Sequence, residues 1–152
     1  MQSRMQNVAA LVPDALRALI AFSGVSRQGG VPDTTLYMIT LRASQINGCG
    51  VCVDMHAREM REAGESVERI ASVAAWRETP YFTDAERAAL ALAESATRLS
   101  DRSDPVPDDV WEEAARHYDE DGLASLVIAI AAINAWNRLN VTTRQMAGSV
   151  HA

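Results

Sequence analysis

Helix-forming patterns cover almost all of the 152 residues, and no stretch alternates apolar and polar residues with the period of two that a half-buried strand requires. Start and stop signals bound several of these patterns. One predicted helix begins at Pro32-Asp33 and runs to Asn47, and Gly48 is a typical residue to end it. The run Thr83-Asp84-Ala85-Glu86 is a capping box that precedes an apolar run. The patterns predict helices over residues 13–23, 32–47, 49–63, 88–99, 108–117 and 123–138, a shorter helix after Ser66, and loops over residues 24–31 and 76–82. We therefore expect one all-α domain, residues 1–152, built as a bundle of about seven helices.

Charge and hydropathy narrow the classes of function. The formal net charge is −6, and all 14 basic residues are arginines scattered among acids, so we expect no nucleic-acid partner. The longest apolar stretch, Leu123 to Ile133, is about half as long as a bilayer span. It favours a buried helix at the centre of the bundle or in a subunit interface, and no membrane partner. Residues 8–12 are too short for the apolar core of a signal peptide, and we expect a cytoplasmic protein.

The two cysteines of the chain fall in one run, Cys49-Gly50-Val51-Cys52-Val53-Asp54-Met55-His56. Cys49 begins a helix, where unpaired backbone N–H groups and the helix dipole stabilise a thiolate and lower the thiol pKa below its free value of about 8.5. Cys52 lies three residues on, within disulfide reach, and His56 lies one turn further along the same face. A nucleophile, a resolving thiol and a base are thus stacked in line. In a reducing cytosol, a disulfide between these thiols is expected to form transiently during a reaction and not to serve as a permanent structural link.

This run has two other interpretations. Cysteine is among the most often buried residues, and the two thiols can serve as packing alone. The run also offers three zinc ligands, but a structural zinc site needs four, and the other histidines, His117 and His151, lie in no paired ligand motif. We therefore expect a redox dithiol that uses no metal and no cofactor.

A longer run around the cysteines carries a family resemblance. Residues 41–56, Leu-Arg-Ala-Ser-Gln-Ile-Asn-Gly-Cys-Gly-Val-Cys-Val-Asp-Met-His, resemble the signature of the alkylhydroperoxidase D-like (AhpD-like) branch of the carboxymuconolactone decarboxylase superfamily. Residues 76–82 and 133–140 resemble the same branch, so the resemblance covers residues 32–140. It implies an all-α fold that assembles as a homotrimer or homohexamer. It also implies that the dithiol reduces a peroxide substrate and is recycled by a thiol/disulfide electron donor.

The resemblance also implies roles for the residues of the run. Cys52 would attack the peroxide and become a sulfenic acid, Cys49 would resolve it to a disulfide, and His56 would help to deprotonate Cys52 through water. The spacing independently pairs Cys52 with His56, because these two residues are one turn apart. We therefore take Cys49, Cys52 and His56 as the candidate catalytic residues.

One position departs from the family pattern. The family relay ends in a glutamate twelve residues before the first cysteine, and that position is Tyr37 here. A phenol is a poor base at neutral pH. Two acids are candidate replacements: Glu59, three residues after His56, and Glu94, a lone acid in an apolar run. We favour a solvated acid for Glu59, whereas Glu94 has to be exposed or partnered.

Two asparagines, Asn134 and Asn137, end the apolar helix. Their amides are expected either to bond across a subunit contact or to cap the helix and meet solvent.

These observations predict a thiol-dependent peroxidase of the alkylhydroperoxidase type. Two alternatives remain. Tyr37 keeps open a non-enzymatic, redox-responsive oligomeric module whose disulfide changes its assembly or its partners. A carboxymuconolactone decarboxylase-type enzyme shares the fold implied by the resemblance, but that branch does not use this dithiol, so the motif argues against it.

Overall fold

The computed structural model describes residues 2–100 and 102–148, and within these residues the protein is helical and has no strand. The elements are eight α-helices and two 3-10 helices, η1 and η2. In chain order they are α1 (Val8–Leu11), α2 (Pro13–Val25), η1 (Ser26–Gly29), α3 (Asp33–Asn47), α4 (Gly50–Glu62), α5 (Val67–Ser72), η2 (Val73–Glu78), α6 (Asp84–Thr97), α7 (Asp108–His117) and α8 (Glu120–Thr143). The all-α bundle expected from the sequence is confirmed.

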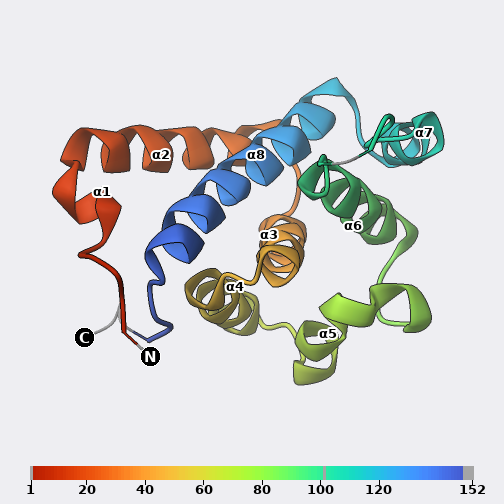
Figure 1. Ribbon diagram of the computed structural model, residues 1–152. Coiled ribbons are helices and arrows are strands. Elements are labelled where there is room, and N and C mark those ends of the chain that lie inside the picture. Colours follow the sequence, from red (N-terminus) through yellow and green to blue (C-terminus); the bar gives the residue numbers. More distant parts are fainter. Residues whose placement is uncertain (1, 101, 149–152) are drawn as a thin grey trace.

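Helix α3 lies at the centre of the fold, where it packs against α4, α6 and α8 (Figure 1). Helix α8 runs diagonally across the bundle and also contacts α2 and α6. The side chains at the centre of these contacts are apolar and almost fully buried: Met38, Ile39, Leu41, Met60, Leu90, Leu92, Leu126 and Ile130. Packing of these apolar faces, more than helix propensity, holds helices of this length in place. It fixes the junction between α3 and α4, which carries the cysteines, against α8.

Most helix boundaries follow the chemistry of their terminal residues. Helix α3 ends before Gly48, whose φ of 69° lies in the left-handed region that favours glycine. The Thr83 side chain accepts from the Glu86 backbone N–H, and the Glu86 side chain accepts from the Thr83 backbone N–H, so both bonds of the predicted capping box are present. Ser66 caps α5 through the Arg69 backbone N–H. Local side-chain chemistry therefore determines where these helices start and stop.

The structure differs from the sequence-based expectation at five places. The expected loops 24–31 and 76–82 are partly helical, because η1 and η2 continue the preceding helices as tight 3-10 turns. The short helix α1 was not expected. Helix α8 begins at Glu120, because the Asp119 side chain accepts a hydrogen bond from the Gly122 backbone N–H at 2.9 Å and caps it there. It continues to Thr143, beyond the apolar periodicity on which its predicted end was based.

Helix α8 is long and apolar enough to cross a membrane by length and composition alone. However, more than half of the most apolar 18-residue stretch of α8 is buried inside the fold, where α8 contacts α2, α3 and α6. Burial of this kind is typical of a core helix in a helical bundle, and it agrees with the expectation of a buried helix.

Candidate active site

The junction between α3 and α4 places both cysteines at the start of a helix. The chain turns at Gly48, and the backbone N–H of Cys49 bonds to the carbonyl oxygen of Ser44 at 3.0 Å. Cys49 is the N-cap residue of α4, and its Sγ accepts a hydrogen bond from the backbone N–H of Cys52 at 3.4 Å. A sulfur in this position satisfies an amide that the helix leaves unpaired, and it lies at the positive end of the helix dipole. Cys49 therefore lies where a helix N-terminus stabilises a thiolate.

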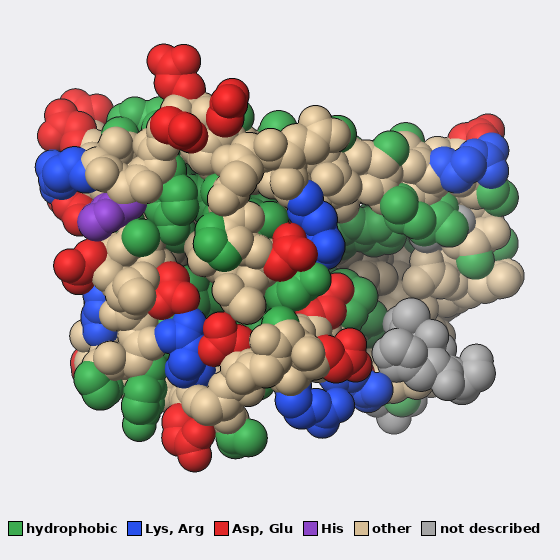
Figure 2. Space-filling model, turned by 180° about the vertical axis from the view of Figure 1, so that it is seen from behind, with side chains coloured by type: hydrophobic (Ala, Val, Ile, Leu, Met, Phe, Trp, Pro, Cys, Tyr) green, Lys and Arg blue, Asp and Glu red, His purple; other side chains and the backbone are tan. Residues whose placement is uncertain are grey.

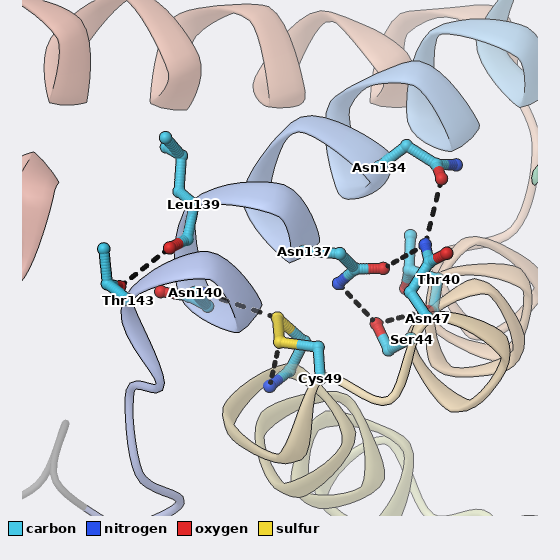
Figure 3. The surroundings of a disulfide bond; sticks show 10 residues. Thr40, Ser44, Asn47, Cys49, Asn134, Asn137, Leu139, Asn140 and Thr143 are labelled. Atoms are coloured by element: carbon cyan, nitrogen blue, oxygen red, sulfur yellow. Dashed lines mark hydrogen bonds between the residues drawn. A yellow bond between two sulfur atoms is a disulfide. The ribbon is translucent and has the colours of Figure 1, made fainter. Parts of the chain in front are cut away.

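Cys49 and Cys52 are joined by a disulfide, with their Cα atoms 5.4 Å apart (Figure 3). Each cysteine is only 1% exposed. They form a small apolar cluster with three neighbours, Ala43, Val51 and Ile133, and Trp136 packs against it. The two thiols thus pack in the interior and also lie close enough to form an intramolecular disulfide, so the packing and redox interpretations are compatible.

No group of three or more His, Cys, Asp or Glu side chains in the part of the chain that the structure describes is arranged to hold a metal ion. His117 ends α7, where it contacts Glu113, and His151 lies outside the described residues.

His56 lies one turn after Cys52 on α4 and is 8% exposed. Its Nδ1 lies 2.6 Å from Oε2 of Glu59, three residues further along the same helix. Its Nε2 is buried and has no hydrogen-bond partner among residues 2–100 and 102–148. A carboxylate beside Nδ1 favours the tautomer that carries its proton there, and this leaves the Nε2 lone pair able to accept a proton. The arrangement therefore suits His56 to act as a base through Nε2.

Glu59, and not Glu94, is the carboxylate at His56. The side chain of Glu59 is 33% exposed, so it is partly solvated, as expected. It also contacts His56 and so connects the buried imidazole with solvent. Glu94 is excluded as the partner because its carboxylate is bound elsewhere, by Arg42, Trp76 and Arg77. Tyr37, at the family relay position, accepts a hydrogen bond from Arg27 Nη2 at 3.2 Å. The carboxylate that contacts His56 thus comes from α4 itself, at the i, i+3 spacing seen in the sequence.

Three asparagines of α8 point toward α3 and α4 (Figure 3). Asn47 donates from Nδ2 to the Oδ1 atoms of both Asn134 and Asn137, each at 2.9 Å, and Asn137 donates to Ser44 Oγ at 3.1 Å. These bonds lie within one chain, so the expectation of a subunit contact or a helix cap for Asn134 and Asn137 was wrong. Asn140 donates from Nδ2 to Cys52 Sγ at 3.5 Å. No signal in the sequence marks Asn140 as a site residue beyond its spacing of three from Asn137, which puts it on the same helix face.

The contact between Glu59 and His56 makes a testable prediction. Glu59→Gln keeps the size of the side chain but removes the negative charge beside Nδ1, so oxidation of the dithiol by peroxide should slow about ten-fold, a small part of what a positioned base contributes. Stopped-flow oxidation at neutral pH would measure this rate. Glu62→Gln is the matched control, because Glu62 is an exposed acid near the end of the same helix. Equal rates for the two variants would contradict a role for Glu59.

Comparison with known proteins decides the family. A model described as the carboxymuconolactone decarboxylase family matches residues 13–95, more than half of the chain. The chain belongs to the carboxymuconolactone decarboxylase family. Within it, the chain lies in the AhpD-like branch, as the resemblance of residues 32–140 implied.

Two similar proteins cover nearly the whole chain. The uncharacterized protein YdfG of Bacillus subtilis (strain 168) is 34% identical over 139 residues, which span 91% of this chain and 93% of YdfG. The crystal structure of an Agrobacterium tumefaciens protein of unknown function, provisionally assigned there to antioxidant defence as AhpD, is 36% identical. It superposes with a TM-score of 0.89 and covers 96% of this chain and 98% of that one. The crystal structure supports the AhpD-like fold over 96% of this chain.

A shorter match connects the chain with a protein of named activity. The alkyl hydroperoxide reductase AhpD of Methylocella silvestris is 43% identical over 47 residues, which are 31% of this chain and 26% of that protein. The similarity to a named reductase is therefore confined to a segment. The chain is therefore an AhpD-like member of the family, and it carries a C-x-x-C pair at disulfide distance.

Proposed function

We propose that the protein is a thiol-dependent peroxidase that reduces peroxides through a Cys49/Cys52 dithiol–disulfide cycle assisted by His56. The observation that carries this proposal is the composition of the site. Two cysteines lie at disulfide distance at the start of α4, and the next turn holds a buried histidine whose Nε2 has no partner in the described chain. Nucleophile, resolving thiol and base are the groups that such a cycle requires.

The proposed cycle has three balanced steps. The Cys52 thiolate attacks one oxygen of the peroxide, the O–O bond breaks, and a proton from His56 converts the leaving oxygen into an alcohol or water. Cys52 is then a sulfenic acid. The Cys49 thiol attacks its sulfur, the S–S bond forms, and the hydroxyl leaves as water after taking up the Cys49 proton. A dithiol donor finally reduces the disulfide by thiol–disulfide exchange and is itself oxidised to a disulfide.

A steady-state assay with a dithiol donor tests this function. We expect one donor dithiol to be oxidised for each peroxide reduced, over many turnovers per chain, and we expect hydrogen peroxide to react faster than a bulky alkyl hydroperoxide because both sulfurs are buried. A protein in which both cysteines are serine is the control. A single round of oxidation without turnover would overturn the enzyme and favour the redox-responsive module. Peroxide reduction that survives in the control would overturn the Cys49/Cys52 cycle, and a dithiol that is not oxidised by peroxide would leave the decarboxylase type as the alternative.

We also propose that the protein works as a homotrimer or homohexamer. Helix α2 is rich in apolar residues but has no buried residue, and its exposed side chains include Ile20 and Phe22, 57% and 42% exposed. Figure 2 shows hydrophobic side chains along the arm of the molecule that α2 forms, at the upper right. On the outer side of α8, Val127 is 43% exposed. Exposed apolar surface of this kind is typical of subunit interfaces.

Light scattering tests the assembly. At micromolar concentration we expect three or six times the 16.5 kDa chain mass. Ile20→Glu should reduce the mass, because it places a charge on the apolar surface of α2. Val67→Glu is the matched control: Val67 is 72% exposed but lies on α5, away from α2. A monomer mass for the unmodified protein would refute the proposal.

We further propose a cytoplasmic location, because a reducing compartment returns the disulfide to the dithiol form that the cycle needs.

A further inference from the structure

The sulfur of Cys52 receives a hydrogen bond from outside its own helix. Asn140 lies near the end of α8, and its Nδ2 donates to Cys52 Sγ at 3.5 Å (Figure 3). A disulfide sulfur carries no proton, so it can only accept in this contact. The side-chain amide of Asn140 is therefore aimed at the atom that the proposed cycle makes the nucleophile.

The position of Asn140 is fixed by its neighbours on the same helix face. One turn before it, Asn137 is 1% exposed and bonds to Ser44 and Asn47 of α3. One turn before that, Asn134 bonds to the same Asn47. These buried amide bonds hold α8 in one register against α3, because a shift along the helix would leave several of them unpaired. The network thus fixes where α8 places Asn140 against α4, and from there the Asn140 side chain reaches Cys52 Sγ.

The two sulfurs have donors of different origin. Cys49 Sγ accepts from the backbone N–H of Cys52, a donor that the helix start supplies whatever the side chains are. Cys52 Sγ accepts from the side chain of Asn140. A substitution at position 140 can therefore remove the donor of one sulfur and leave the donor of the other in place.

We propose that Asn140 is a catalytic residue that stabilises the Cys52 thiolate through this hydrogen bond. This role rests on the proposed function, because it concerns the thiolate that would attack the peroxide. A hydrogen bond to a charged acceptor is stronger than one to a neutral acceptor, so the amide favours the thiolate over both the thiol and the disulfide. The same bond acts in the recycling step. When the donor thiolate attacks Cys49 Sγ, the S–S bond breaks, Cys52 leaves as a thiolate beside Asn140, and Cys49 stays in a mixed disulfide with the donor.

The charged groups around Cys52 do not duplicate this role. On α4 itself, His56 lies one turn after Cys52 and contacts Glu59, and Asp54 is paired with Arg58. The arginines of the helices packed against α4 are engaged elsewhere: Arg42 of α3 with Glu94, Arg69 of α5 with Glu86, and Arg138 of α8 with the carbonyl oxygen of Asn134. The donor to Cys52 Sγ in the described part of the chain is thus the neutral amide of Asn140.

The test compares thiol reactivity in two single-cysteine backgrounds. The rate of alkylation by iodoacetamide is measured against pH, and the midpoint of the profile reports thiolate formation. In the Cys49→Ser background, Asn140→Leu should raise the midpoint by about one pH unit, as expected for loss of a hydrogen bond to a charged group. Asn140→Asp, which keeps the shape but adds a negative charge, should raise it further. In the Cys52→Ser background, Asn140→Leu should leave the midpoint of Cys49 unchanged, whereas the added charge of Asn140→Asp should raise it, because the two sulfur positions are adjacent.

The two backgrounds separate this role from a structural one. With Asn140→Leu, a general loosening of the α4–α8 contact would change the profiles of both cysteines, and that result would overturn the proposal, as would an unchanged midpoint for Cys52. Far-UV circular dichroism identifies variants that do not fold. Asn140→Ala removes the amide without adding bulk or charge, so it allows the test if Asn140→Leu does not fold. Alkylation needs no peroxide, so the outcome does not depend on whether the peroxidase assay succeeds.

Discussion

Replacing Cys52 with serine should abolish peroxide consumption, whereas replacing Cys49 with serine should leave a sulfenic acid that can be trapped on Cys52. Cys52 lies one turn from His56, and attack on a peroxide requires a proton for the leaving oxygen, which His56 can supply only at short range. Cys49 is needed afterwards, to resolve the sulfenic acid. A dimedone-type reagent followed by mass spectrometry identifies the oxidised cysteine, and a peroxide electrode measures consumption.

The helix start gives the opposite assignment some support. Cys49 is the N-cap residue and lies closer to the positive end of the helix dipole, which favours its thiolate. If the sulfenic acid forms on Cys49 in a Cys52→Ser variant, the two roles are reversed. His56→Ala separates the chemistry from the pairing. It should slow formation of the sulfenic acid, yet a strong oxidant should still close the disulfide, because that reaction needs only the proximity of the two sulfurs.

The parts of the fold that the sequence predicted well are those set by local chemistry. The left-handed Gly48 and the capping box of Thr83 act through residues at most a few positions away, so their signals can be read directly from the chain. The spacing of Cys49, Cys52 and His56 on one helix is local in the same sense. The disulfide contact between the cysteines is present in the structure.

The parts that the sequence did not predict depend on how helices meet. Asn140 approaches Cys52 only because α8 crosses α4 in a particular register, which a single sequence does not specify. The destination of Glu94 is also nonlocal, since its arginine partners lie 52 and 17 residues away along the chain. Glu59 is a different case. Its i, i+3 spacing to His56 was visible, but the same spacing also occurs on solvated helix faces, so burial of the imidazole was needed to decide between the two.

Removing the carboxylate of Glu94 should strongly destabilise the fold. Glu94 is 5% exposed, and its oxygens bind Arg42 at 2.6 Å, Trp76 Nε1 at 3.1 Å and Arg77 at 2.5 Å, so one group ties α6 to α3 and η2. Glu94→Ala leaves Arg42, with only 13% of its side chain exposed, without its partner. Breaking a buried pair in this way costs about 3–5 kcal/mol, a large share of the stability of a typical domain. Urea unfolding at neutral pH measures the loss.

The pH dependence of this loss distinguishes the carboxylate from simple packing. Burial by itself would raise the pKa of Glu94, but hydrogen bonds from Arg77, Arg42 and Trp76 outweigh it and hold the pKa below its ordinary value of 4.5. A carboxyl group whose pKa is lower in the folded than in the unfolded state stabilises the fold above the ordinary pKa, and this contribution is lost as the pH falls through the lowered value. The difference in unfolding free energy between the unmodified protein and Glu94→Gln should therefore shrink progressively below about pH 4.5.

Glu113→Gln is the control, because Glu113 pairs with Arg116 and His117 on the surface, where ion pairs contribute little. A difference for Glu94→Gln that stays constant into the acid range would show that shape, and not charge, makes Glu94 important for stability.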